Sequence, residues 1–373
     1  MREAPPIVRM LAGAAAGVLV SVLAVLLAAA VAPVPSAPRL VPEDGSGHLR
    51  RIAIHYVPGM DGRVMPVWRE LFGALPDDVE VVVAVSRAAD FDRLIARLRA
   101  DSVPRLARFR PAVVERPLTT WSRDRMAALE GGVLAPPRVP VASAARAGDW
   151  DAPLAISRAV YGQGPRIAEY VFEGGDLAAS RSFLFADGNL IGRNVGRGDA
   201  TRAHLAAALG RTFRQEVVWL GDAPGDVPEH HIMMYMVPLD DRTVIVGDAR
   251  LGRQLAGAAF DALDPEPDFE LHAARFDRAA AQLAARGFRV VRAPVVVLAG
   301  AGSYVTYTNA LFDRDARGPV VYLPTYDVPA LDRAAAALYE SLGVRVVPID
   351  VSTVYRMNGS LGCLVNVMAR DAR

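Results

Sequence analysis

Cys363, the sole cysteine among 373 residues, is the first candidate for covalent chemistry. Gly359 and Gly362 bracket its loop, and a glycine-rich turn lets the backbone approach a substrate closely. Backbone amides at such a turn can also lower the pKa of a thiol, which favours the nucleophilic thiolate. A free cysteine is also among the most buried residue types. The residue type and its loop therefore leave two interpretations, a nucleophile and a small core side chain.

Two adjacent histidines, His230 and His231, precede the apolar run 232–237, which we predict to be a strand. Histidine is the commonest general acid or base, because its pKa lies close to neutral pH. Neighbouring side chains on a strand point to opposite faces, so we expect the two rings not to share one metal or one substrate. Two structural histidines are the alternative.

Two further clusters place carboxylates beside tryptophan or glycine. Trp121 and Arg123 precede Asp124, and Glu173 and Asp176 flank two glycines. A solvated edge and an exposed turn explain the same clusters, and a turn explains the asparagine Asn309.

Composition excludes several classes of protein. The chain is 52% hydrophobic and 22% charged, which excludes a largely disordered chain, and a net charge of +1 argues against a dedicated nucleic-acid binder. The sequence contains no lysine, so a Walker A loop, a pyridoxal Schiff base and a lysine general base are excluded. One cysteine excludes an intramolecular disulfide and cysteine-based zinc or iron–sulfur centres.

The N-terminal segment 1–34 is predicted to be a signal anchor or a signal peptide. Residues 10–34 carry no charge, follow Arg2 and Arg9, and are numerous enough to span a bilayer. We expect the rest of the chain to be membrane-anchored and to face outside the cytoplasm, or to be secreted or periplasmic if the segment is cleaved. Residues 35–49, rich in Pro, Gly, Ser and Asp, are predicted to be a linker to a domain at 50–373.

Strand and helix patterns alternate along that domain, which indicates a mixed α/β fold of short strands. The spacing suggests repeated strand–strand–helix–strand modules. We predict strands at 51–58, 79–86, 217–220, 232–237, 243–248, 288–294, 304–312, 320–324 and 344–350. We predict helices at 64–75, 88–100 and 328–342, and a helical stretch at 251–287 that is interrupted by the prolines in 264–267.

In chain order, the Trp-x-Arg-Asp cluster, the Glu-Gly-Gly-Asp cluster, the histidine and the near-terminal loop with cysteine resemble the pentein, or guanidine-modifying, superfamily. Within it the chain is most similar to the agmatine deiminase and peptidylarginine deiminase group, from about Arg51 to the C-terminus. The resemblance implies a five-bladed α/β propeller of strand–strand–helix–strand modules around a central site. It implies neither a metal nor an organic cofactor, and as partner a small guanidino compound or peptidyl-arginine.

The resemblance also implies a role for each matched residue. Cys363 would be the nucleophile, His231 the general acid and base, and Glu173 the group that pairs with the substrate or orients the histidine. Asp124 would hold the guanidinium. The other residues implied to bind the substrate are Trp121, Arg123, Asp176 and Asn309.

The sequence departs from the family pattern at two positions. The family has His-x-Asp where this chain has His231-Ile-Met233, and the agmatine branch has histidine where this chain has Gly362. Three explanations of Met233 remain open: the substrate is not a free guanidinium compound, Asp226 or Glu229 replaces the missing acid, or catalysis has been lost.

Three functions therefore compete. The first is hydrolysis of a guanidino or amidino C–N bond through a covalent thiouronium at Cys363. The second is a non-catalytic binding protein with the same fold. The third is an unrelated cysteine amidase, which would not need Asp124.

Overall fold

The structure is a computed structural model that describes residues 37–140, 143–300 and 302–371. The predicted signal segment 1–34 lies outside the described residues. Within those ranges, no helix has both the length and the apolar character needed to cross a bilayer. Residues 40–44 of the predicted linker pack on the domain, because the N–H groups of Val41 and Glu43 donate to the carbonyls of Ala128 and Ala179, both at 2.8 Å.

The strands of the described residues form five separate sheets. In chain order they are β1 (Leu49–Tyr56), β2 (Glu80–Val85), β3 (Phe109–Val113), β4 (Ala127–Leu129), β5 (Gly132–Ala135), β6 (Arg166–Ile167), β7 (Ala178–Ala179), β8 (Phe183–Asp187), β9 (Glu216–Leu220), β10 (Met236–Pro238), β11 (Thr243–Asp248), β12 (Arg289–Val297), β13 (Tyr304–Thr306), β14 (Leu311–Asp315), β15 (Gly318–Thr325), β16 (Arg345–Asp350) and β17 (Val365–Arg370).

Helices lie between these strands along the chain. They are α2 (Asp61–Ala74), α3 (Ala88–Ala100), α4 (Ala152–Tyr161), α5 (Asn189–Asn194), α6 (Arg202–Thr212), α7 (Ala249–Ala256), α8 (Phe269–Ala285), α9 (Pro329–Ser341) and α10 (Leu361–Leu364). The pattern predicted the amphipathic helix 88–100 with its observed bounds, and Leu94 and Leu98 on its apolar face are fully buried.

The sheets repeat one topology, which confirms the mixed α/β class. An antiparallel strand pair is followed by one or two helices and then by a strand parallel to the second member of the pair. This order holds for β4-β5-α4-β6, for β7-β8-α5-α6-β9, for β10-β11-α7-α8-β12 and for β14-β15-α9-β16.

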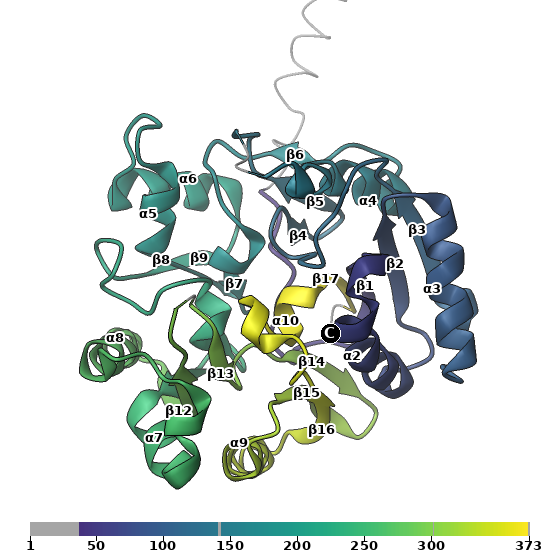
Figure 1. Cartoon of the computed structure of the whole chain (residues 1–373). Coiled ribbons are helices and arrows are strands. Elements are labelled where there is room, and N and C mark those ends of the chain that lie inside the picture. Colours follow the sequence, from purple (N-terminus) through teal and green to yellow (C-terminus); the bar gives the residue numbers. More distant parts are fainter. Residues whose placement is uncertain (1–36, 141–142, 301, 372–373) are drawn as a thin grey trace, which may run out of the picture. The chain divides into compact units, whose positions relative to one another are not determined.

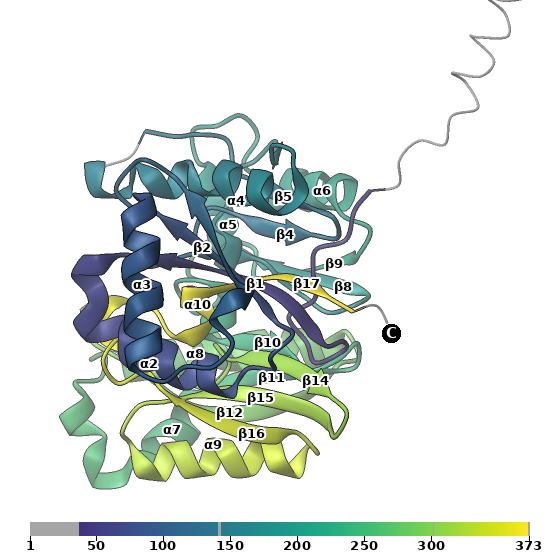
Figure 2. The ribbon, with the colours of Figure 1, turned by 90° about the vertical axis from the view of Figure 1, so that its right-hand side faces the viewer.

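The fifth sheet is completed by strands from both ends of the domain. β17 pairs antiparallel with β1, with Val365 opposite Ile54, and β1 pairs parallel with β2. β2 lies between β1 and β3, and its residues Val81 to Val85 are at most 1% exposed, as the continuous apolar run predicted. Figure 1 shows the sheets grouped around α10, and Figure 2 shows β17 running away from α10 beside β1. The pairing of β17 with β1 therefore places α10, which contains Cys363, near the centre of the domain.

Candidate active site

A cavity of about 200 Å³ lies beside Cys363 and contains five of the eight predicted site residues. It is lined by Trp121, Asp124, Arg146, Glu173, His230, His231, Met357, Asn358 and Cys363. A larger cavity of about 430 Å³, around Arg370, contains none of the predicted site residues. In the described ranges, no three His, Cys, Asp or Glu side chains are grouped so that they could hold a metal ion.

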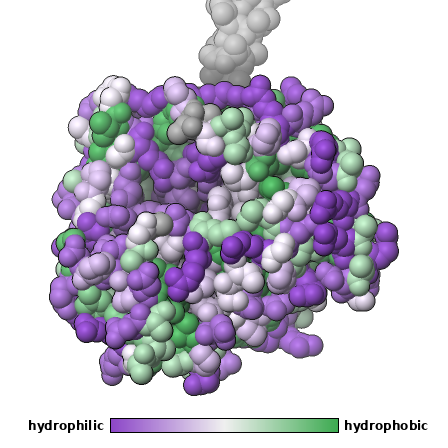
Figure 3. Space-filling view, in the orientation of Figure 1, coloured by the Kyte–Doolittle hydropathy of each residue, from purple (hydrophilic) through white to green (hydrophobic). Residues whose placement is uncertain are grey.

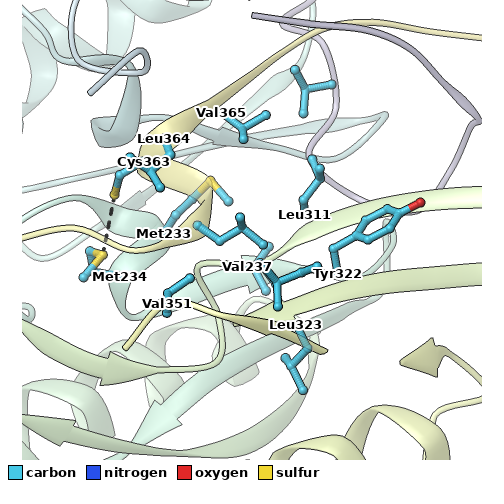
Figure 4. Packing of buried hydrophobic residues seen from close by; sticks show 14 of the residues in the cluster. Met233, Met234, Val237, Leu311, Tyr322, Leu323, Val351, Cys363, Leu364 and Val365 are labelled. Carbon is cyan, nitrogen blue, oxygen red and sulfur yellow. Dashed lines mark hydrogen bonds between the residues drawn. The ribbon is translucent and has the colours of Figure 1, made fainter. Parts of the chain in front are cut away.

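Cys363 is 2% exposed, yet it lines this cavity. Its sulfur lies 3.7 Å from Oδ1 of Asn309 and 3.9 Å from Sδ of Met234, the contact drawn in Figure 4. Gly362 allows the first of these contacts, because a Cβ at that position would lie 3.0 Å from the Asn309 side-chain oxygen. Asn309 therefore touches the sulfur rather than lining the cavity, and its buried Nδ2 has no hydrogen-bond partner.

His231 and Glu173 form the second part of the site. Nε2 of His231 lies 2.9 Å from Oε2 of Glu173. The same carboxylate pairs with Nη1 of Arg125 at 2.7 Å and Nη2 of Arg193 at 2.8 Å. Nδ1 of His231 is buried without a partner. Glu173 therefore fixes one ring nitrogen, and the other is left for the reaction.

Both partners of this pair are stabilised in the charged form. Burial opposes the charge of His231, but the nearby Cys363 and the hydrogen bond and charge of Glu173 outweigh it and raise the His231 pKa to about 10. Burial opposes the charge of Glu173 as well, but the His231 hydrogen bond and the charge of Arg193 hold its pKa well below the usual range. At neutral pH the pair is an imidazolium and a carboxylate.

The structure corrects the expectation that His230 and His231 point apart. Residues 232–234 form a 3-10 turn rather than a strand, and β10 begins only at Met236. His230 has a positive φ of 76°, and Nδ2 of Asn189 donates to its carbonyl at 3.2 Å. The two rings therefore stack edge to face, with centroids 4.6 Å apart, and both line the cavity. Burial and the charge of His231 lower the pKa of His230 to about 3, so this second ring is neutral at physiological pH.

The same turn corrects the register expected for Met233. A two-residue period holds on a strand, but in this 3-10 turn it is the next residue, Met234, whose sulfur contacts Cys363. The proposed replacement acids lie elsewhere. Asp226 accepts hydrogen bonds from the N–H groups of Asp222 and Ala223, and Glu229 pairs with Arg275; neither lines the cavity. The explanation in which Asp226 or Glu229 supplies the missing carboxylate is therefore wrong.

Asp124, the expected guanidinium ligand, is paired with a guanidinium of this chain. Nη2 of Arg146 donates to its Oδ2. Burial and the charge of Glu173 raise the pKa of Asp124, so the carboxylate depends on nearby cations to remain ionised. Arg146 was missed by the sequence analysis, since no motif marks an isolated arginine between the Trp121 cluster and the Glu173 cluster.

Two predicted substrate ligands lie outside the cavity. Arg123 is buried, donates to Glu43 and to the carbonyl of Leu177, and does not line the cavity. Asp176 accepts a hydrogen bond from the backbone N–H of Glu173 at 2.7 Å and forms an ion pair with Arg193, with 2.6 Å between Oδ2 and Nε. Asp176 therefore supports Glu173 from behind, and neither residue has access to a substrate from these positions.

Gly175 supports His231 by having no side chain. A Cβ on Gly175 would lie 2.4 Å from Cγ and from Nδ1 of the His231 ring. We expect Gly175→Ala to displace the ring and lower the rate of the hydrolysis that the sequence resemblance implies by at least about tenfold, because misplacing a reacting group is costly. The rate and the thermal midpoint of purified variants are the measurements.

Gly210 is the matched control for this change, because a Cβ there meets nothing within 4 Å. Gly210→Ala lies inside helix α6 and is expected to stabilise slightly, by up to about 1 kcal/mol. Unchanged activity in Gly175→Ala would contradict the position of His231 described above.

Comparisons with known proteins support the fold and leave the sequence family unassigned. No model of a known protein family matches this chain, and no curated protein is similar enough to be matched. The chain is similar in structure to the agmatine deiminase of C. jejuni, with a TM-score of 0.64 and 15% identity over 90% of this chain and 97% of that chain. The agmatine deiminase of Enterococcus faecalis gives a TM-score of 0.62 and 14% identity over 90% of this chain and 96% of the other. The C. jejuni enzyme with substrate bound gives a TM-score of 0.65, at 14% identity. This chain therefore has the fold of these agmatine deiminases, the group that its motifs resembled.

Proposed function

We propose that the chain hydrolyses a C–N bond of a guanidino or amidino compound through a covalent adduct on Cys363. One observation carries the proposal: Cys363, the His231–Glu173 pair and Asp124 line a single cavity, although they come from four distant segments. Similar solved structures are agmatine deiminases, one of them with its substrate bound, which favours this reaction class. We also interpret the five sheets as the five blades of a propeller closed by β17.

The proposed first half-reaction forms a bond between sulfur and the guanidinium carbon. Asp124 holds the planar cation, and its charge and geometry bring the carbon to the sulfur of Cys363. The thiolate adds, and a tetrahedral centre forms. The imidazolium of His231 then gives its proton to the departing amine, the C–N bond breaks, and a thiouronium remains on Cys363.

The second half-reaction releases the product. His231, now neutral, takes a proton from a water molecule, whose oxygen attacks the thiouronium carbon. The C–S bond breaks and returns the electron pair to sulfur, and the second proton of the water passes to the solvent. A neutral ureido compound leaves, and the thiolate is restored beside an imidazolium. Glu173 keeps the ring oriented throughout and favours its protonated form between turnovers, as the raised pKa of His231 indicates.

A non-catalytic binding protein is the second candidate. It is favoured by the thioether of Met234 beside Cys363, where the family pattern calls for a second acid nearby, and by the pairing of Asp124 with Arg146. A site with one carboxylate in place of two binds a guanidinium more weakly. The hydrophilic face seen in Figure 3 fits a charged small molecule better than a broad apolar partner.

Ammonia release tests the choice between these functions. The purified full-length protein is incubated with agmatine, with arginine and with a peptide that contains arginine, and is separately treated with a haloacetamidine that alkylates an activated cysteine. Hydrolysis predicts ammonia from at least one compound and a mass increase located at Cys363. Binding without ammonia, together with an unlabelled Cys363, would establish the binding protein instead.

We further propose that the domain works outside the cytoplasm, either held at a membrane by residues 10–34 or released after cleavage. The support is the uncharged segment itself, preceded by Arg2 and Arg9. Cell fractionation combined with the mass of the mature N-terminus tests it. An uncleaved protein in the cytosolic fraction would contradict this location.

A further inference from the structure

Arg146 forms an ion pair with Asp124, the carboxylate to which the substrate would bind in the proposed reaction. Its Nη2 donates to Oδ2 of Asp124, and its Nε donates to Oδ2 of Asp149 at 3.1 Å. The Asp124 side chain is 8% exposed, whereas that of Arg146 is 32% exposed and lines the cavity. A planar cation from the chain itself therefore sits where a guanidinium substrate must bind.

The two ends of this guanidinium are held with different firmness. Asp149 is fully buried and is fixed by Thr119, whose N–H and Oγ1 both donate to it at 2.8 Å. Nε of Arg146 is thus anchored to a rigid partner, while Nη2 faces the cavity. A rotation about the Nε end would free Asp124 and keep the cation at the edge of the cavity.

Charge balance then determines which ligand can enter. A ligand that carries only positive charge must separate Arg146 from Asp124. Nε of Arg146 then still pairs with Asp149, but its Nη2, which faces the cavity, loses its anion. Met234 next to the sulfur offers no second acid to compensate. A ligand that carries a guanidinium and a carboxylate exchanges one internal ion pair for two pairs with the protein, and the net charge of the cavity does not change.

We propose that Arg146 is a specificity-determining residue, which releases Asp124 to a ligand's guanidinium when it binds an anionic group of the same ligand. The substrate class is therefore a guanidino compound with a carboxylate, in preference to one with a second cation. This inference rests on the proposed function for the reaction, but its binding preference can be measured without turnover.

Three ligands that share a four-carbon chain test the preference: 4-guanidinobutyrate, butylguanidine and agmatine, which carry a carboxylate, no further group and an ammonium. Their binding to the full-length Cys363→Ala protein is measured by calorimetry, so that no ligand is consumed. We expect 4-guanidinobutyrate to bind at least about tenfold more tightly than agmatine. We expect Arg146→Gln to abolish that preference and to favour agmatine, and Arg146→Lys to retain part of it.

Arg158→Gln is the matched control, because Arg158 is exposed on α4 and does not line the cavity. It should leave the ranking unchanged, and circular dichroism should report folded protein for every variant. An unchanged ranking in folded Arg146→Gln, or no binding of any ligand, would overturn the inference. The unmodified protein, which retains Cys363, separates the two proposals. If it never releases ammonia while the order of ligand affinities still depends on Arg146, the proposed function fails and this inference stands. Ammonia release with equal binding of all three ligands would support the proposed function and overturn this inference.

Discussion

Replacing Cys363 with alanine should abolish ammonia release from the protein's guanidino substrate and leave the fold intact. The sulfur is the atom that would form the covalent bond, and no other cysteine can replace it. Removal of a nucleophile that works together with its acid and base commonly eliminates nearly all of the rate enhancement, so we expect a fall of at least about 10⁴-fold. Ammonia release under saturating substrate is the measurement.

The fold should tolerate this change because alanine keeps the Cβ and removes one buried atom. We expect a loss of about 1 kcal/mol in the free energy of unfolding, measured by urea titration. Ligand binding should persist in Cys363→Ala, and the haloacetamidine label should be lost. Ammonia release that survives at more than a few per cent would remove Cys363 from the mechanism.

Glu173→Gln should produce the second large effect, on both activity and stability. The carboxylate has three cationic partners, His231, Arg125 and Arg193, and its side chain is only 12% exposed. Removing one partner of a buried charge network leaves the others uncompensated, which typically costs about 3–5 kcal/mol. We expect a loss of that order in the free energy of unfolding and a fall in ammonia release of at least about 10²-fold.

The pH dependence distinguishes this role from a purely structural one. The folded pKa of His231, about 10, lies above its ordinary value of 6.5, so the imidazolium stabilises the fold fully below pH 6.5 and the contribution disappears as the pH rises through about 10. In Glu173→Gln the His231 pKa should fall, and the loss of stability should shift to lower pH. The imidazole titration, followed by NMR, and unfolding at several pH values between 6 and 11 are the measurements.

Glu340→Gln is the matched control, since Glu340 lies exposed on α9. It should leave both the His231 titration and the unfolding curve almost unchanged. A His231 pKa that is the same in Glu173→Gln and in the unmodified protein would show that Glu173 does not hold the imidazolium.

Arg146 also bears on the question that Met233 left open, namely how the site could bind a guanidinium without a second carboxylate. The pairing of Asp124 with a cation of the chain suggests how this site could work without the second acid: the ligand would supply the anion that frees Asp124. The same pairing would make an agmatine-like dication a poor ligand. The absence of histidine at Gly362 has a local reason as well, because a side chain there would collide with Asn309.

Local sequence patterns were sufficient to predict the longer helices and strands. The helix 88–100 and the buried strand β2 were predicted because side-chain periodicity and continuous β-branched runs depend only on near neighbours. Strands such as β6 and β7 were not predicted, since two residues carry no periodicity. The turn at 232–234 was mistaken for a strand because its apolar residues are buried on all sides by tertiary contacts.

The sequence by itself determined the class of the fold, the order of its modules and the residue types available for chemistry: one thiol, few histidines and no lysine. Only the tertiary structure decided which of them meet. It brought Asp124, Glu173, His231 and Cys363 to one cavity, turned Arg123 away from it, and placed Arg146 on Asp124. The physical reason is that residue type and local spacing are encoded by neighbours in the chain, whereas these contacts depend on how all five sheets pack. The hydrogen bond from the backbone N–H of Arg123 to the carbonyl of Cys363, for example, joins residues 240 positions apart.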